Sequence, residues 1–152
     1  MASRRKGRIL AFQALYSWDI QFSSSRDASI RDSISEGLLD FSWADGDAPL
    51  DEKSAAFPRL LVTGTIENIA DVDSMFQRHL ENWELSRLNK VDLAVLRMSV
   101  YTLMFQSETP PSVVIDEAVE ISREFGADDS YRFVNGVLDS VRKTLAGEAV
   151  SK

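Results

Sequence analysis

The sequence predicts an all-α protein, a compact single domain of about six or seven helices. Apolar residues recur at the three- and four-residue spacing of amphipathic helices along most of the chain, and no segment alternates as a strand would. A length of 152 residues suits one hydrophobic core, and 44% hydrophobic with 27% charged residues is an ordinary globular composition. We expect the domain to span residues 1–146 and residues 147–152 to form a flexible C-terminal tail.

The N-terminal third predicts two helices and a loop. A first helix is expected from Ser3, as its N-cap, to about Gln21. Its periodic apolar positions are Ile9, Phe12, Leu15 and Tyr16. A short helix is expected at about residues 28–39. The segment 41–51 contains a glycine and a proline among acids, which predicts a surface loop.

The middle of the chain predicts a long helix and then a central one. Residues 57–83 should form one helix, or two stacked end to end, with Pro58 in the first turn, where its missing N–H costs nothing. The apolar stripe is Leu60, Leu61, Ile66, Ile69, Val72, Phe76 and Leu80. Residues 89–105 should follow, capped by Asn89 with Asp92 three residues on. Apolar residues lie almost all round this helix, so we expect it to be the most buried.

Two helices are expected to close the chain. Residues 113–125 form the first, with Gly126 as the glycine just past its end. Asp129 or Ser130 should cap the second. Its core positions are Phe133 or Val134, Val137, Leu138, Val141 and Leu145. Gly136 inside this helix costs about 1 kcal/mol relative to alanine, which predicts a close backbone approach or a surface that must stay free of bulk.

Several classes of function are disfavoured. The chain has no cysteine, hence no disulfide, thiolate nucleophile or cysteine-ligated metal, which fits a reducing cytoplasm. No apolar run approaches the roughly 18 residues of a membrane span. His79 is the only histidine, and the sequence has neither a glycine-rich phosphate loop nor a nucleophile elbow. The adjacent acids Asp128 and Asp129 suit a helix cap better than an acid/base pair. We therefore expect no enzyme, no metal and no cofactor.

The charge distribution points to a local basic site on an acidic protein. The net charge is −7, but Arg4, Arg5, Lys6 and Arg8 lie close together with no acid before Asp19. Such a patch is typical of local contact with phosphates. Cations at a helix N-terminus oppose the helix dipole, so they do not serve the helix itself. A solvated, frayed terminus is the alternative.

Several aromatic positions have two possible roles. Tyr16 and Trp18 could stack on bases beside the basic residues, although core packing is the commoner fate at this spacing. Phe133 follows Arg132 and precedes Val134, so one of the two apolar side chains must point away from the core. Trp43 and Trp83 are expected to anchor packing.

The sequence resembles the bacterial transcription antitermination factors of the NusB family. Four blocks carry the resemblance in the family's order and cover most of residues 3–142: RRKGRILAFQALYSW, LENWELSRLNKVDLAVLRMSVYTL, PSVVIDEAVEISREFG and GADDSYRFVNGVLD. The resemblance implies two packed helical bundles and a protein without catalytic activity. It also implies binding to the single-stranded boxA element of ribosomal RNA leader transcripts together with NusE, a ribosomal protein that doubles as a transcription factor. The pair would nucleate an antitermination complex on RNA polymerase and serve ribosomal RNA maturation.

The family's functional positions map onto ten residues of this chain. RNA contacts are implied for Arg4, Arg5, Lys6, Arg8, Tyr16, Arg132 and Phe133. Contacts with NusE are implied for Asp129, in the acidic turn, and for an apolar surface that includes Pro111 and Val113. The alternative is a protein-interaction module, self-associating as a homodimer or binding NusE, with a minor direct role in RNA binding. The acidic net charge favours this alternative, whereas the acid-free run from Ser3 to Trp18 favours RNA.

Overall fold

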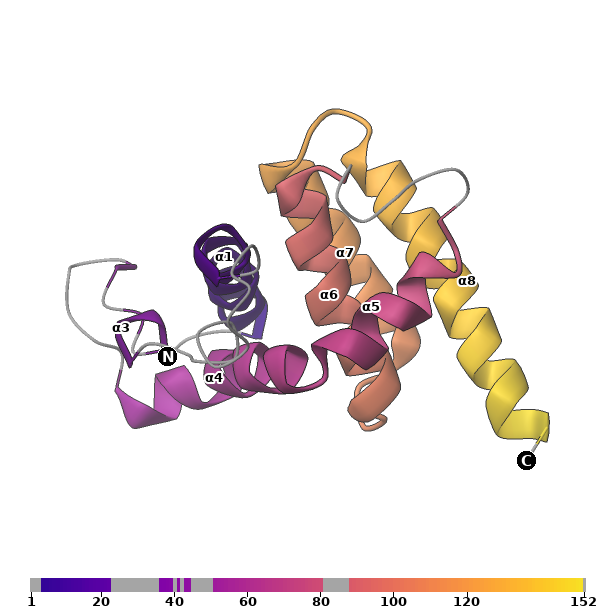
Figure 1. The fold of residues 1–152 in the computed structure, drawn as a ribbon, viewed down its shortest axis with the longest axis horizontal. Coiled ribbons are helices and arrows are strands. Elements are labelled where there is room, and N and C mark those ends of the chain that lie inside the picture. Colours follow the sequence, from indigo (N-terminus) through magenta and orange to yellow (C-terminus); the bar gives the residue numbers. More distant parts are fainter. Residues whose placement is uncertain are drawn as a thin grey trace. The chain divides into compact units, whose positions relative to one another are not determined.

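The computed structural model describes residues 4–22, 36–39, 41, 43–44, 51–80 and 88–151. All regular elements within these ranges are helices, which confirms the predicted fold class (Figure 1). They form two compact units, Met1–Glu67 and Asn68–Lys152, in agreement with the two helical bundles that the resemblance implies. None of the helices in the described part of the chain is long and apolar enough to cross a membrane.

The first unit is built on the packing of α1 (Arg4–Phe22) against α4 (Glu52–Glu67), with the short α3 (Glu36–Leu39) also against α4. The buried face of α1 includes Leu10, Ala11, Ala14, Leu15 and Trp18. Trp18 is therefore a core residue, and its role is packing. The expected cap Ser3 and most of the expected helix at 28–39 lie outside the described residues.

The start of α4 corrects the predicted position of Pro58. The Asp51 carboxylate accepts a hydrogen bond of 2.7 Å from the backbone N–H of Ser54, which is the capping interaction of a helix that begins at Glu52. Pro58 consequently lies inside the helix and is buried, not in the first turn. The predicted stripe is wrong at Leu60, which is 51% exposed.

The segment after α3 does not begin as a simple surface loop. Phe41 is fully buried and has a φ of 57°, in the left-handed region that non-glycine residues seldom adopt. Phe41 thus lies in the core, whereas Trp43 is 42% exposed. Trp43 is thus a surface residue, although it contacts the Phe41 ring at 5.7 Å between centroids. The greater part of the expected loop lies outside the described residues.

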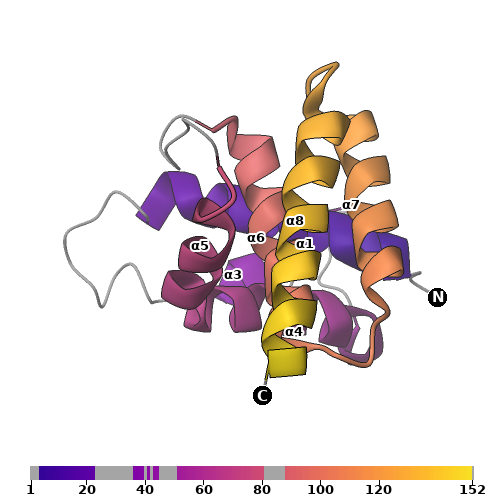
Figure 2. The same ribbon diagram turned by 90° about the vertical axis from the view of Figure 1, so that its right-hand side faces the viewer.

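The second unit comprises α5 (Ile69–Gln77), α6 (Lys90–Phe105), α7 (Pro111–Phe125) and α8 (Ser130–Ser151). Helix α6 packs against the other three, and α7 lies alongside α8 (Figure 2). Residues Asp92 to Thr102 are buried without interruption, which confirms α6 as the central helix. Asn89 caps it as predicted, because its side chain accepts from the backbone N–H groups of Val91 at 2.8 Å and Asp92 at 3.4 Å.

Helix α5 is separate from α4, as in the two-helix version of the prediction. Asn68, between them, has φ −113° and ψ 22°, outside the helical range. Within the second unit, the Arg97 guanidinium donates two hydrogen bonds of 2.9 Å to the Asp73 carboxylate and so ties α6 to α5. Trp83 lies outside the described residues.

The junction of α7 and α8 depends on Gly126. It follows α7 where predicted, but its φ of −92° and ψ of −175° are extended, not left-handed. A glycine is required here for space: a Cβ atom would lie 2.7 Å from the Ser122 carbonyl oxygen and 2.8 Å from Cβ of Ser130. Helix α8 then starts at Ser130, and the Asp129 carbonyl accepts from Phe133 N at 3.4 Å, which makes Asp129 the cap position. Because α8 continues to Ser151, the expected tail is helical over nearly all of its length.

Candidate functional site

The basic end of α1 presents its charges at the surface. Arg4, Arg5 and Lys6 are exposed and Arg8 is partly exposed, on the first turns of a helix with no acidic residue in its first turn. The cationic side chains are therefore accessible, and their contact with phosphates stays a prediction. Positive charge at this end gains nothing from the helix dipole, so the dipole does not account for the cluster.

Two of these cations have an aromatic partner that the sequence analysis missed. The guanidinium carbon of Arg4 lies 4.1 Å from the centroid of the Phe57 ring, and that of Arg8 lies 5.4 Å from it. Both distances are within the range of a cation–π interaction. Gly7 makes this arrangement possible, because a Cβ atom on it would lie 2.7 Å from Cδ2 of Phe57. The RRKGR sequence (residues 4–8) thus packs the start of α1 against Phe57 of α4 and holds the guanidinium groups of Arg4 and Arg8 in place.

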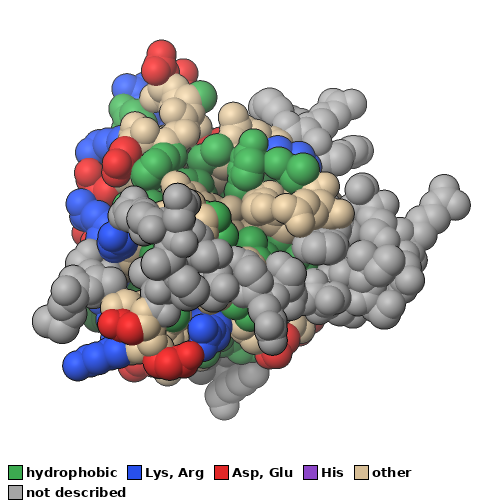
Figure 3. Space-filling view, turned by 90° about the vertical axis from the view of Figure 1, so that its left-hand side faces the viewer, with side chains coloured by type: hydrophobic (Ala, Val, Ile, Leu, Met, Phe, Trp, Pro, Cys, Tyr) green, Lys and Arg blue, Asp and Glu red, His purple; other side chains and the backbone are tan. Residues whose placement is uncertain are grey.

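Tyr16 is exposed on the same helix, with 37% of its surface accessible. Its spacing from Arg5, Ile9 and Ile20 places these four residues on one side of α1. Ile20 is also exposed, at 54%. The face of the molecule in Figure 3 likewise displays hydrophobic side chains at the surface beside both basic and acidic ones. An exposed tyrosine on a helix that carries a cationic cluster can stack on a base.

In the second unit, Arg132 is organised by Tyr131. The Arg132 side chain donates a hydrogen bond of 3.0 Å to the Tyr131 hydroxyl. The Arg123 guanidinium lies on the same ring, with its carbon 4.7 Å from the centroid. Tyr131 therefore groups two arginines from α7 and α8 at one end of the second unit. Sequence reasoning singled out Arg132 but overlooked Tyr131 and Arg123.

Phe133 is neither fully buried nor fully exposed. Val134, next to it, is completely buried, so Val134 takes the core position and Phe133 lies at the margin. Phe133 borders a hollow of about 610 Å³ between the start of α6 and the start of α8. The hollow is lined by Leu88, Asn89, Asp92, Ala127, Asp128, Asp129, Ser130 and Phe133.

Asp92 is the chemically distinctive group in this hollow. It is only 7% exposed, and its Oδ1 atom has no hydrogen-bond partner. Burial raises the pKa of the Asp92 carboxyl above its usual value, and the Ser130 hydroxyl offsets part of that rise. An unsatisfied buried acceptor is costly unless a water molecule or a ligand supplies a donor. The sequence analysis placed Asp92 at a capping position and did not foresee its burial beside this hollow.

The expected partner residues lie at the start of α7. Pro111 and Val113 are both exposed, as an apolar docking surface requires. Pro111 also lines a hollow of about 500 Å³ whose other residues are Leu103, Ser112, Arg142, Leu145 and Ala146. Phe105, at the end of α6, is 46% exposed. The structure therefore supplies exposed apolar surface around the segment that was predicted to contact a partner.

The ten predicted site residues fall into two groups. Arg4, Arg5, Lys6, Arg8 and Tyr16 lie on α1, in the first unit. Pro111, Val113, Asp129, Arg132 and Phe133 lie in the second unit. Among the residues that the structure describes, no cluster of histidine, cysteine, aspartate and glutamate could hold a metal ion.

The described part of the chain is all-helical, with a cationic helix end, exposed aromatic side chains and exposed apolar surface, and has the architecture of a small helical-bundle protein. The chain belongs to the NusB family, whose model matches residues 5–143. The family comprises transcription antitermination factors, which are not enzymes, and this confirms the non-enzymatic prediction.

Individual relatives agree with this assignment. The transcription antitermination protein NusB of Treponema denticola is 49% identical over 139 residues, which cover 91% of this chain and 95% of that protein. The solved structure of T. maritima NusB has a TM-score of 0.74 at 34% identity and covers 93% of this chain and 92% of that one. A crystal structure of the antitermination factors NusB and NusE in complex with dsRNA has a TM-score of 0.72 at 23% identity, over 93% of this chain and 96% of that one, and so matches in fold.

Proposed function

We propose that this protein is an RNA-binding transcription antitermination factor that acts without catalysis in the cytoplasm. Its ligand would be the single-stranded boxA element of ribosomal RNA leader transcripts, bound together with the ribosomal protein NusE. The bound pair would join the RNA polymerase antitermination complex and support ribosomal RNA synthesis and maturation. The observation that carries the proposal is the exposed cationic end of α1 on a chain whose net charge is −7.

The α1 end would supply affinity through phosphates. Arg4, Arg5, Lys6 and Arg8 can each neutralise one phosphate, and the contact of Arg4 and Arg8 with Phe57 would limit the side-chain entropy lost on binding. Tyr16, exposed on the same helix, would stack on a base. Such contacts bind single-stranded RNA with little dependence on its sequence.

The hollow beside Phe133 would supply selectivity. The Phe133 ring offers a stacking surface, and the unpartnered Oδ1 of Asp92 can accept a hydrogen bond from the exocyclic amino group of a base. The exposed carboxylates Asp128 and Asp129 would repel phosphates from the mouth of the hollow, so a base edge, not the backbone, would enter. Arg132, held by Tyr131, would bind the flanking phosphate.

The partner would contact the apolar start of α7. Pro111 and Val113 are exposed there, and Asp129, exposed in the same unit, offers a negative charge to a basic ribosomal protein. The homologue of 23% identity was crystallised with NusE, which supports a partner of this kind for the present chain. The same exposed apolar residues also favour a second candidate function, a self-associating or NusE-binding module whose direct role in RNA binding is minor.

A titration tests the proposal and separates it from the alternative. A labelled boxA-like single strand is titrated with the protein, alone and with NusE, beside a strand of the same composition in scrambled order. The proposed function predicts tighter binding to the boxA-like strand, strengthened by NusE. Binding to NusE or self-association, with equally weak binding of both strands under all conditions, would support the interaction module instead.

A further inference from the structure

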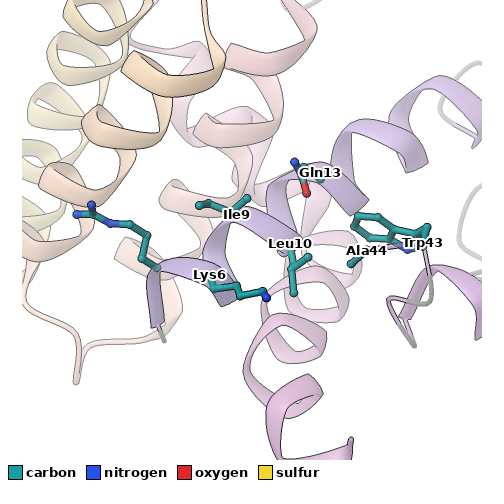
Figure 4. Close-up of a pocket in the computed structure, with 7 residues that line it drawn as sticks. Lys6, Ile9, Leu10, Gln13, Trp43 and Ala44 are labelled. Carbon is teal, nitrogen blue, oxygen red and sulfur yellow. The ribbon is translucent and has the colours of Figure 1, made fainter. Parts of the chain in front are cut away.

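A second hollow, in the first unit, combines positive charge with an exposed indole. It has a volume of about 870 Å³ and is lined by Arg5, Lys6, Ile9, Leu10, Gln13, Trp43 and Ala44. Figure 4 shows Lys6, Leu10 and Gln13 along α1, with Trp43 and Ala44 on the segment that faces them. Trp43 is not among the functional positions that the family resemblance implies, so its exposure needs a separate explanation.

Trp43 is held in position by two contacts. Its indole Nε1–H donates a hydrogen bond of 3.3 Å to the Leu38 carbonyl, and its ring lies against Phe41 at an interplanar angle of 59°. Phe41, at a positive φ, is fully buried, whereas Trp43 is 42% exposed. The indole is therefore an ordered surface group whose polar edge already has a partner. What it still offers to a ligand is its apolar face.

The composition of the hollow decides the kind of ligand. An aromatic face suits any planar base, and Arg5 and Lys6 at the other side suit a phosphate. No carboxylate lines this hollow among the residues that the structure describes, in contrast to the hollow beside Phe133. A peptide could use the apolar face, but it would need an acidic residue next to an apolar one, whereas every nucleotide carries both required groups.

We propose that the hollow between α1 and Trp43 is an additional nucleotide subsite, in which a base of single-stranded RNA stacks on Trp43 while its phosphate contacts Lys6 and Arg5. The inference rests on the proposed RNA-binding function and extends it. The RNA path would leave the basic end of α1 along the side that carries Trp43. Trp43 would add a contact that depends weakly on base identity, and would therefore strengthen binding without changing sequence preference.

The test uses the whole protein and a labelled boxA-like single strand, with NusE present and absent. Trp43→Leu keeps an apolar cover over Phe41 but removes the aromatic face, and Trp43→Phe restores an aromatic ring. Stacking predicts that Trp43→Leu weakens RNA binding at least about five-fold, as loss of one stacked base does. Trp43→Phe should recover most of that affinity. The boxA-like and scrambled strands should be affected by the same factor.

A charge substitution tests the phosphate contact of Lys6, which the proposed function and the subsite share, so only the Trp43 variants decide the subsite. Lys6→Gln should lower the slope of log affinity against log salt by about 0.7, the value for one phosphate contact on a single strand. Lys53→Gln, at an exposed lysine of the same unit that does not line the hollow, serves as the matched control and should leave the slope unchanged. Thermal midpoints of all variants establish that each is folded at the temperature of the titration.

The outcomes are distinguishable. Wild-type RNA affinity in folded Trp43→Leu overturns the subsite and leaves the proposed function intact. The subsite is likewise overturned if both Trp43 variants lose RNA affinity only in proportion to their loss of folded protein, because Trp43 would then be a cover for the core. Loss of NusE binding or self-association at unchanged RNA affinity assigns the hollow to a protein partner and also refutes the subsite. Absence of RNA binding by the wild type under every condition removes both proposals.

Discussion

Phe133→Leu tests whether the Phe133 ring serves RNA recognition or core packing at the hollow between α6 and α8. Phe133 is only partly exposed, so truncation to alanine would lose part of the 3–5 kcal/mol that a fully buried phenylalanine typically contributes, and instability would confuse the result. Leucine retains most of the apolar volume. A swap of this kind typically costs less than about 1.5 kcal/mol. The fully buried Val134 and Leu138 keep the core stripe of α8 intact.

The same substitution removes the aromatic face that we assign to a base. Loss of one stacking interaction is worth about 1–3 kcal/mol, so the RNA dissociation constant should rise about 5- to 150-fold. The assay is a titration of labelled boxA-like RNA without NusE, paired with urea denaturation of the same protein. Phe105→Leu is the control, because Phe105 is exposed in the same unit but does not line the hollow. Unchanged RNA affinity of folded Phe133→Leu, or an equal loss in Phe105→Leu, would refute the assignment.

Three further predictions concern the glycines, the buried carboxyl and the basic helix end. Gly126→Ala should lower the free energy of unfolding by about 1–3 kcal/mol, because the added Cβ would lie 2.7 Å from a backbone oxygen. Gly136→Ala should raise the free energy of unfolding by about 0.5–1 kcal/mol, because a Cβ there would have nothing within 4 Å. Urea denaturation measures both. The raised pKa of Asp92 means that the folded state binds the carboxyl proton more tightly than the unfolded state, so the free energy of unfolding falls as pH rises above the ordinary value of 3.8. Thermal scans should show Asp92→Asn to be more stable than wild type near neutral pH. This difference should shrink below pH 3.8. The double variant Arg5→Gln, Lys6→Gln should lose about 1.4 from the salt slope of RNA binding, and a slope equal to that of wild type would exclude both residues from phosphate contact.

The helices themselves follow from the sequence because their causes are local. Periodic apolar residues, the Asn89 cap and the nearly continuous apolar character of 91–103 placed α6 and identified it as the central helix. The sequence analysis took Pro58 as the mark of the first turn of α4, whereas the Asp51 carboxylate caps a helix that begins earlier, at Glu52. Leu60 fits the helical period but is exposed, because periodicity does not show which part of an apolar stripe packs against another helix.

The candidate site was predictable in its charges but not in its contacts. Arg4 and Arg8 are visible as cations, yet their shared partner Phe57 is far away in sequence, and only folding brings it to Gly7. For this reason, removal of residues 1–8 would lower stability as well as RNA affinity, and is a poor test of phosphate contact. The sequence carries no signal for the positive φ of Phe41, nor for the burial of Phe41 and the exposure of Trp43.

RNA binding by the proposed surface can be observed residue by residue by NMR. The measured quantity is the change in the chemical shift of each backbone amide on addition of boxA-like RNA. In a uniformly labelled sample, we expect the perturbed amides to cluster on the first turns of α1, around Tyr16, and around the hollow that contains Asp92 and Phe133. Amides of α5 from Ile69 to Gln77 should remain unchanged, because none of its residues belongs to the proposed RNA surface. Shifts confined to α5, or no shifts at any RNA concentration, would contradict the proposed mode of RNA binding.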